Sequence, residues 1–453
     1  MRKIVEPTGT SHNHSLAHSA FHALKWRYAG AVLQAGLQFA VGITLVRLLS
    51  PEAFGIVGMA LIAIGLGRLV GDLGFGAAII QYPHITPRHV RAAFTGSVVM
   101  GTLLFVVLWF VAPYISVVFG QEVLTPILRI IGVSLVVSGL SVISTCLLRR
   151  ELQFRLLTVI ETFSYLAGFG AVGISMAVFD YGVWSLVAAN IVQLFLLFAL
   201  GIHFGKQPIL PYFRIQEYRD LFRVASAEML NNLINFAAEN LHFFVIGKWL
   251  GAAALGFFNR SYHLMHLPVK HFSFGLSSVM FPLYAKIQGD VPRLGRAFLH
   301  TVSLTALVTI PVFFAIAVVP EIVMVGLFGE QWKSGSETLR ILCLAGPFMA
   351  MMRVFGSVSH ARGYVFSECG RQVIYLVVMG VALWLLFPFG LKGVAVAVAL
   401  AIFVRYLLLA HLSLKLAGVT WRQFFTVQVP GCLIGITVSL LVYAASTAVE
   451  MFI

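Results

Sequence analysis

The stretch RLLSPEAFG at residues 47–55 has a counterpart, KWLGAAALG, at residues 248–256. Three further pairs follow in the same order and at a similar spacing of about 200 residues. They are FG at 75–76 with FG at 274–275, LRI at 128–130 with LRI at 339–341, and GVWSLVA at 182–188 with GLKGVAV at 390–396. Each match is weak by itself, but the shared order and spacing indicate an internal repeat.

The composition places this repeat in a membrane. Of the 453 residues, 59% are hydrophobic and 11% are charged, and the mean hydropathy is +0.93. A soluble domain carries about 25% charged residues, so a water-soluble fold is excluded. About 20 apolar residues are needed for one transmembrane helix. The apolar stretches are 28–49, 54–80, 92–117, 124–147, 156–179, 183–203, 221–247, 262–285, 297–319, 335–359, 370–388, 391–412 and 424–448.

The sequence therefore predicts an all-α membrane protein of about thirteen transmembrane helices. Equivalent stretches are separated by an even number of spans, so both halves have the same orientation. We expect two six-helix lobes in a pseudo-two-fold repeat around a central cavity, with the substrate path between the lobes. The predicted segments are a first lobe with a cytoplasmic tail (1–203), a cytoplasmic linker (204–220), a second lobe (221–423) and an additional C-terminal helix (424–453).

The charge distribution predicts the orientation of the spans. The net charge is +14, and most Lys and Arg residues lie in the N-terminal tail and in every second loop. The opposite loops hold only Arg47, Lys248, Arg260, Lys333 and Lys392. This bias predicts a cytoplasmic N-terminus and attraction to anionic membrane lipids. Binding of nucleic acid is not expected, because the charge is spread over many segments.

Motifs for catalysis are missing from the sequence. No G-x-x-x-x-G-K-[ST] phosphate loop occurs, and the four Asp residues are too far apart for a D-x-D metal site. The four Cys residues are scattered through apolar stretches. We therefore predict no catalytic residue, no metal site and no cofactor, and we expect a proton or sodium gradient to drive transport.

A polar stripe on span 221–247 is the strongest signal for a functional site. Residues three to four apart share one helical face, and here they are Glu228, Asn231, Asn232, Asn235, Glu239 and His242. A charge at mid-membrane costs about 2.5–3.5 kcal/mol, so this face should meet protein or water. The repeat aligns Glu228, Asn235 and Glu239 of this stripe with Arg27, Gln34 and Gln38. We expect both stripes to line a shared aqueous cavity, although hydrogen bonds between packed helices are an alternative.

Other charges lie inside apolar spans. Arg68 and Lys270 are candidates for binding an anionic group, and Arg353 and Arg405 would extend the cationic lining. A structural ion pair between Arg68 and Asp72, four residues apart, is an alternative. The predicted substrate-binding residues are Arg68, Lys270, Arg27, Gln34, Gln38, Asn231, Asn235, Arg353 and Arg405. The candidates for ion coupling are Asp72, Glu228 and Glu239.

The motifs RLLSPEAFG at 47–55 and DLGFGAAIIQ at 72–81 resemble the polysaccharide-exporter branch of the multidrug/oligosaccharidyl-lipid/polysaccharide (MOP) flippase superfamily, closest to its Wzx/WzxC-like lipopolysaccharide biosynthesis proteins. The resemblance covers about residues 20–420. It implies a MOP/MATE-like fold in the bacterial inner membrane. It also implies flipping of undecaprenyl-diphosphate-linked oligosaccharide to the periplasmic leaflet for O-antigen, capsule or exopolysaccharide synthesis. In such flippases, cationic residues of the cavity-lining helices bind the diphosphate, and Arg68 and Lys270 lie where that pattern suggests.

Other functions remain open at this stage. A cation-coupled multidrug exporter of the MATE type has the same fold. A flippase for the peptidoglycan precursor lipid II is a second alternative. An O-antigen polymerase or ligase is an enzyme of similar hydropathy, but such enzymes resemble one another in a long periplasmic loop, and the outer loops here are short. A secondary transporter that works with a polysaccharide polymerase or export machinery is therefore favoured over an enzyme.

Overall fold

The computed structural model describes residues 34–72, 79, 85–151, 153–205, 212 and 215–452. Helices make up nearly all of these residues, and no strand occurs among them. Within this part of the chain, nine segments are long and apolar enough to cross a membrane. The predicted all-α membrane fold is confirmed, and the number of about thirteen spans stays a prediction.

The chain divides into two compact units, of which the first contains the described residues of Met1–Leu48, Gly67–Phe110 and Ile127–Met229. Its complete helices are residues 34–48, α6 (Phe154–Tyr165), the π-helical η1 (Leu166–Gly173), α7 (Ile174–Val178) and α8 (Val183–Gly205). Four helices contribute residues to both units: α2 (Pro51–Asp72), α4 (Pro87–Phe119), α5 (Leu124–Arg150) and α9 (Ile215–Trp249). The lobe boundaries at residues 203, 220 and 423 stay predictions.

The second unit contains the described residues of Leu49–Leu66, Val111–Pro126 and Leu230–Ile453. Its helices begin with α10 (Gly251–Pro268), the π-helical η2 (Val269–Ser273), α11 (Phe274–Lys286), α12 (Val291–Val318), α13 (Pro320–Phe328) and η3 (Glu330–Gly335). They continue with α14 (Ser336–Ala361), α15 (Val365–Leu386), η4 (Phe387–Phe389), α16 (Gly390–Ala417), α17 (Trp421–Thr426) and α18 (Val429–Phe452).

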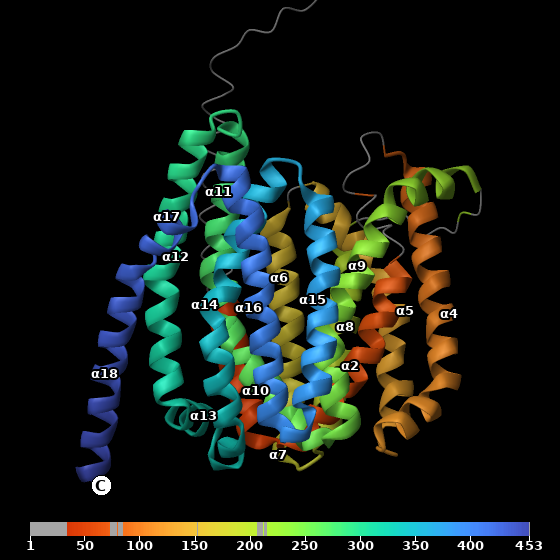
Figure 1. Cartoon of the computed structure of the whole chain (residues 1–453). Coiled ribbons are helices and arrows are strands. Elements are labelled where there is room, and N and C mark those ends of the chain that lie inside the picture. Colours follow the sequence, from red (N-terminus) through yellow and green to blue (C-terminus); the bar gives the residue numbers. More distant parts are fainter. Residues whose placement is uncertain are drawn as a thin grey trace, which may run out of the picture. The chain divides into compact units, whose positions relative to one another are not determined.

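Helix α14 forms the centre of the second unit, because α10, α11, α12 and α16 all pack against it (Figure 1). Phe355 of α14 lies there against Phe298, Tyr406 and Phe424, with ring centroids 5.5–6.0 Å apart. All four side chains are almost fully buried. Helix α18 runs along α12 at the edge of this core. Packing among apolar side chains therefore fixes α14 and α16, which carry charged residues to the site described below.

The repeated motifs contact each other reciprocally within the second unit. A Cβ atom at Gly55 would overlap the carbonyl oxygen of Ala252, and a Cβ at Gly256 would overlap the carbonyl oxygen of Pro51. The repeat aligns Gly55 with Gly256 and Pro51 with Ala252. Each half thus makes the contact that the other half makes, as expected at a two-fold axis. Glycine is required at both positions because the two backbones approach so closely.

A second equivalence joins the two LRI motifs. Pro113 has no N–H, so the helix leaves the carbonyl oxygen of Trp109 without its usual donor, and Arg129 Nε donates to this oxygen at 3.4 Å. Arg340 Nε likewise donates, at 3.3 Å, to the carbonyl oxygen of Ala317 in the last turn of α12, where helix carbonyls lack intrahelical partners. The two arginines therefore have the same structural role in the two halves.

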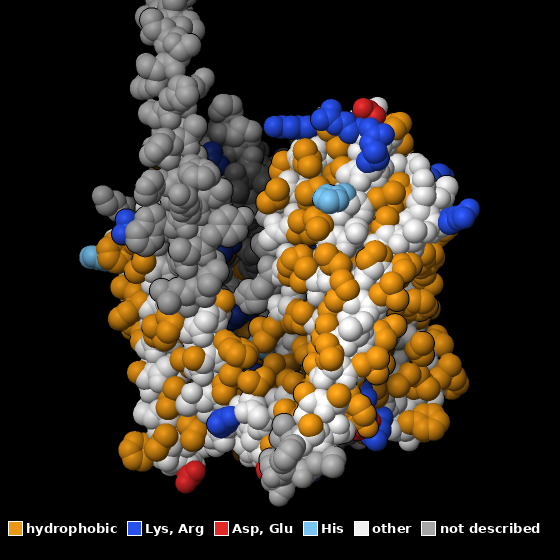
Figure 2. Space-filling model, turned by 90° about the vertical axis from the view of Figure 1, so that its left-hand side faces the viewer, with side chains coloured by type: hydrophobic (Ala, Val, Ile, Leu, Met, Phe, Trp, Pro, Cys, Tyr) orange, Lys and Arg blue, Asp and Glu red, His pale blue; other side chains and the backbone are white. Residues whose placement is uncertain are grey.

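The surface of the described helices is suited to lipid. Figure 2 shows hydrophobic side chains along the sides of the helices and Lys and Arg side chains mainly toward their ends. Large exposed apolar residues occur along whole helices, for example Val99, Leu103, Phe110 and Val117 of α4 and Leu440 of α18. In water such a surface would be an aggregation hazard, so the chain is an integral membrane protein.

Candidate functional site

The second unit contains a half-open cavity of about 750 Å³. Helices α9, α10, α11, α14, α15 and α16 line it. Its polar lining consists of Glu239, Asn240, His266, Ser277, Arg353, Ser357, His360, Glu368 and Arg405. Its aromatic lining consists of Phe243, Tyr262, Phe281 and Tyr375. Within a membrane protein, so many polar groups need a water-filled space or a polar ligand beside them.

Two guanidinium groups reach this cavity, from Arg353 of α14 and Arg405 of α16. Among the residues that the structure describes, neither forms a salt bridge. The Arg405 guanidinium carbon lies 5.0 Å from the ring centroid of Tyr375, a cation–π contact that positions it. One guanidinium group can bind two phosphate oxygens through two parallel hydrogen bonds. The cavity can therefore bind an anion such as a phosphate.

Acidic groups occupy other parts of the same lining. Glu239 of α9 is exposed to the cavity and, like the two arginines, has no salt bridge within the described residues. Glu368 in the first turn of α15 lies 3.3 Å from Nε2 of His360 in the last turn of α14. These helix ends favour such charges, since the N-terminus attracts anions and the C-terminus attracts cations.

An aromatic wall separates the cavity from the protein interior. The rings of Phe243, Phe258 and Tyr262 lie 5.4–5.9 Å from one another, between α9 and α10. Tyr262 contacts His266 one turn further along α10, with ring centroids 4.5 Å apart. This packing fixes the side of the cavity that faces α9.

The structure brings three of the predicted residues together, namely Glu239, Arg353 and Arg405. Asn235 lies one turn before Glu239 on α9 and is half-buried, and Lys270 lies exposed in η2; neither belongs to the cavity lining. Arg27 lies outside the described residues, and so do the side chains of Asp72, Glu228 and Asn231.

The predicted glutamines lie in the first unit, on the helix of residues 34–48. The Gln34 side chain hydrogen-bonds Glu161, and the Tyr165 hydroxyl donates to the carbonyl oxygen of Gln38 at 3.2 Å. The Gln34 side chain and the Gln38 backbone carbonyl therefore take part in contacts between helices.

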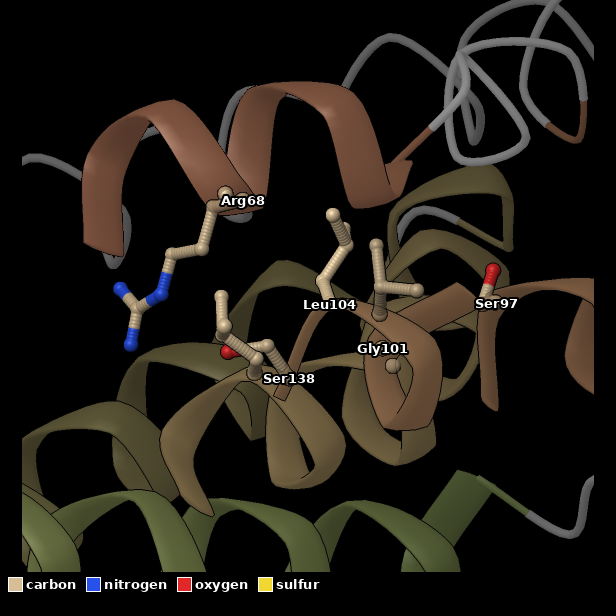
Figure 3. A pocket seen from close by; sticks show the side chains of 9 residues that line it. Arg68, Ser97, Gly101, Leu104 and Ser138 are labelled. Carbon is tan, nitrogen blue, oxygen red and sulfur yellow. The ribbon is translucent and has the colours of Figure 1, made fainter. Parts of the chain in front are cut away.

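Arg68 lies in a separate, small cavity of the first unit, with a volume of about 190 Å³. Figure 3 shows its side chain extending from α2 on the side away from Leu104 and Gly101 of α4, and Ser138 of α5 also lines this cavity. Arg68 Nε is buried and has no hydrogen-bond partner among the described residues, and the same holds for Ser97 Oγ. The cavity of Arg68 is small and mostly apolar, whereas the cavity of Arg353 and Arg405 is larger and has a larger polar share of its lining.

Among the residues of the larger cavity that sequence reasoning missed are Tyr262, Tyr375, His360 and Glu368. A signal existed for two of them, because Glu368 and Tyr375 are seven residues apart and so share one face of α15. His360 lies at the end of an apolar span, where a polar residue is ordinary. Tyr262 has an apolar ring that sequence patterns count as core.

Comparison with known proteins identifies the family. A family model described as polysaccharide biosynthesis protein matches residues 44–337, well over half of the chain. The chain belongs to this polysaccharide biosynthesis protein family. The predicted resemblance to the polysaccharide-exporter branch of the MOP superfamily is thereby confirmed.

Individual relatives show how far the similarity extends. The teichuronic acid biosynthesis protein TuaB of Bacillus subtilis (strain 168) is 28% identical over 301 residues, which are 65% of this chain and 62% of TuaB. The lipopolysaccharide biosynthesis protein WzxC of Escherichia coli (strain K12) is 25% identical over 361 residues, which are 78% of this chain and 72% of WzxC. The chain thus spans less than two thirds of TuaB.

A solved structure extends the comparison to the fold. The lipid II flippase MurJ in an inward closed conformation matches 92% of this chain and 98% of its own, with a TM-score of 0.74 at 15% sequence identity. At this identity the likeness establishes the fold alone. The protein described here therefore shares the fold of MurJ.

Proposed function

We propose that this protein is a flippase that moves undecaprenyl-diphosphate-linked oligosaccharide from the cytoplasmic to the periplasmic leaflet of a bacterial inner membrane, for surface polysaccharide synthesis. The observation that carries the proposal is the pair Arg353 and Arg405, which face a cavity of about 750 Å³ without a salt bridge within the described residues. The family match and the names of WzxC and TuaB support a role in polysaccharide synthesis.

The chemistry of the substrate explains why a protein is needed. Each sugar hydroxyl costs about 2–7 kcal/mol when it loses its hydrogen-bond partners in an apolar medium, and the diphosphate is charged. The polar cavity replaces water for the sugars, and the two guanidinium groups neutralise the diphosphate. The prenyl chain needs no such replacement, because it is as apolar as the lipid.

An ion gradient drives the cycle in this proposal. The sequence contains no phosphate-loop motif for ATP, whereas Glu239 offers a carboxylate to the cavity. One charge that moves through the membrane potential gains about 2.3 kcal/mol per 100 mV. In this proposal the N-terminus lies in the cytoplasm. A polysaccharide polymerase or export machinery receives the flipped substrate.

The test uses a strain that lacks the gene and carries either wild-type protein or a variant. We expect the deletion to accumulate lipid-linked oligosaccharide on the cytoplasmic leaflet. Arg353→Ala and Arg405→Ala each remove charge-assisted hydrogen bonds worth about 1.5–3 kcal/mol, which corresponds to about a 10- to 100-fold loss of export. Arg422→Ala, on the exposed face of α17, is the matched control and should export normally.

Four results would overturn this proposal. A deletion strain without such accumulation would show that the substrate is wrong. Drug hypersensitivity of that strain would point to a multidrug exporter, and loss of viability would point to a peptidoglycan-precursor flippase. Normal export by the two cavity variants, at wild-type abundance, would remove Arg353 and Arg405 from the binding site.

A further inference from the structure

His242 of α9 lies one turn beyond the cavity-lining Glu239 and is fully buried. Its imidazole nitrogens, Nδ1 and Nε2, have no hydrogen-bond partner among the described residues. Aromatic rings surround it: Phe243 at 4.3 Å, Tyr262 at 5.2 Å and Phe258 at 5.4 Å between centroids. A polar ring thus occupies an apolar pocket.

Packing alone does not account for a histidine at this position. A neutral imidazole carries one N–H donor and one acceptor, and each buried group left without a partner costs about 1–3 kcal/mol. A phenylalanine would fill the same space among Phe243, Phe258 and Tyr262 without that cost. The distinctive property of histidine is that it gains and loses a proton in the physiological range of pH.

A row of titratable side chains leads from the cavity to His242. Tyr262 contacts His242 on one side and His266 on the other, with ring centroids 5.2 Å and 4.5 Å apart. Tyr262 and His266 both line the cavity, and His266 Nε2 is also buried without a hydrogen-bond partner in the described part of the chain. One side chain, that of Tyr262, therefore separates His242 from the cavity.

The charges around this row determine when a proton can bind. On α9 the negative group is Glu239, and on α10 the neighbouring groups are Tyr262 and His266. The groups from the other helices are Arg353 of α14, Tyr375 of α15 and Arg405 of α16. The arginines oppose a further positive charge nearby, whereas Glu239 favours it. A bound anion that neutralised the arginines would therefore favour protonation.

Helix α10 has a weak point next to this row. Pro268, two residues after His266, cannot donate the backbone hydrogen bond to Leu264. The π-helical η2 (Val269–Ser273) follows directly. Helices bend at prolines and at π-bulges, so α10 can move relative to α9 here. Such a movement would separate Tyr262 from His242 and admit water.

We propose that His242 is a proton-binding site coupled to substrate binding in the cavity, an inference that rests on the flippase function proposed above. In the arrangement seen here the imidazole is neutral, since an isolated buried charge is very costly. When anionic substrate occupies the Arg353–Arg405 site and α10 moves, a ring nitrogen takes a proton from cavity water. The proton returns to water when His242 is buried again. Because coupling is reciprocal, the proton also tightens substrate binding.

The first experiment follows proton uptake directly. Undecaprenyl diphosphate without glycan is added to purified protein in weakly buffered detergent solution at neutral pH with an indicator dye. We expect wild-type protein to take up about one proton per chain and H242F and H242Q to take up none. H263F, an exposed histidine on α10, should behave as wild type. No uptake by wild type, or equal uptake by H242F, would overturn the proposal.

The second experiment measures export in cells with and without a protonophore. Because the proton and the substrate bind together, wild type and H263F should change their export by about fivefold or more when the proton gradient collapses. H242F and H242Q should export slowly in both conditions, although H242F should melt at the wild-type temperature or above it. If H242F exports as wild type does and responds equally to the protonophore, His242 has no coupling role while the flippase function stands. If the deletion strain accumulates no lipid-linked sugar, the flippase function itself fails.

Discussion

The contact between the two repeated motifs offers the sharpest test of the architecture. Substitution of Gly55 or Gly256 by Ala places a Cβ atom against the carbonyl oxygen of Ala252 or Pro51, respectively. Because both obstacles are backbone atoms, no side-chain rotation can relieve the overlap, and α2 and α10 must move apart. Gly58 is a matched control on α2, since a Cβ there would have only Leu255 and Asn259 side-chain atoms within reach, at 3.4 Å or more.

The expected loss of stability on each substitution follows from these contacts. Forcing extra atoms into a packed interior costs about 1–3 kcal/mol, whereas replacing Gly by Ala in a helix gains up to about 1 kcal/mol. Gly58→Ala should therefore be neutral or stabilising, and Gly55→Ala and Gly256→Ala should each be about 1–3 kcal/mol less stable than Gly58→Ala. One separation of α2 from α10 relieves both overlaps, so the double variant should lose less than the sum of the single variants, by about 0.5 kcal/mol or more.

The measurement is the thermal unfolding of purified protein in detergent, followed by tryptophan fluorescence. Gly55→Ala and Gly256→Ala should lower the melting temperature, and Gly58→Ala should not. Equal melting of Gly55→Ala and Gly58→Ala would show that the two backbones do not approach closely. Additive losses in the double variant would show that the two contacts are not reciprocal parts of one crossing.

Three further predictions concern individual contacts. Trp332 is fully buried against Phe54, Phe257 and Phe328, so Trp332→Ala should cost about 3–5 kcal/mol; a melting temperature equal to that of wild type would contradict this packing. Arg129→Ala removes the donor to the Trp109 carbonyl and should cost about 1–3 kcal/mol. This loss should shrink in a Pro113→Ala background, where residue 113 regains the N–H that Trp109 needs, and an undiminished loss would refute the role of Arg129. Glu368→Gln removes the charge from a half-exposed pair with His360 and should change stability by less than about 1 kcal/mol; a larger fall in melting temperature would show that the pair holds α14 and α15 together.

The sequence predicted much of the fold because the membrane restricts the choices so strongly. Apolar stretches of sufficient length in lipid must be helical, and the repeat of residues 47–55 at 248–256 showed which helices are equivalent. The reciprocal contact of Gly55 and Gly256 was not predictable, because an alignment does not say whether equivalent segments touch. The π-helical segments η1 and η2 were not predictable either, since helical periodicity is the same on both sides of such a bulge.

The three cavity residues that the sequence named are single charges inside apolar spans. Glu239, Arg353 and Arg405 lie inside apolar spans, so each needed a polar neighbourhood, and the structure places all three on one cavity. Arg68 followed the same logic but lies in the small cavity of the first unit. Charge in a span predicts a polar environment, but it does not predict which cavity.

The central claim is that Arg353 and Arg405 bind the phosphate groups of a lipid-linked sugar while it crosses the membrane. The direct measurement uses vesicles that contain the purified protein and a fluorescent undecaprenyl-diphosphate-linked saccharide, with a quencher that cannot cross the membrane. The rate at which inner-leaflet fluorescence becomes quenchable reports flipping. We predict rapid loss with wild-type protein and with Arg422→Ala, and a rate near that of protein-free vesicles with the Arg353→Ala/Arg405→Ala double variant. A double variant that flips the saccharide as fast as wild type would contradict the account.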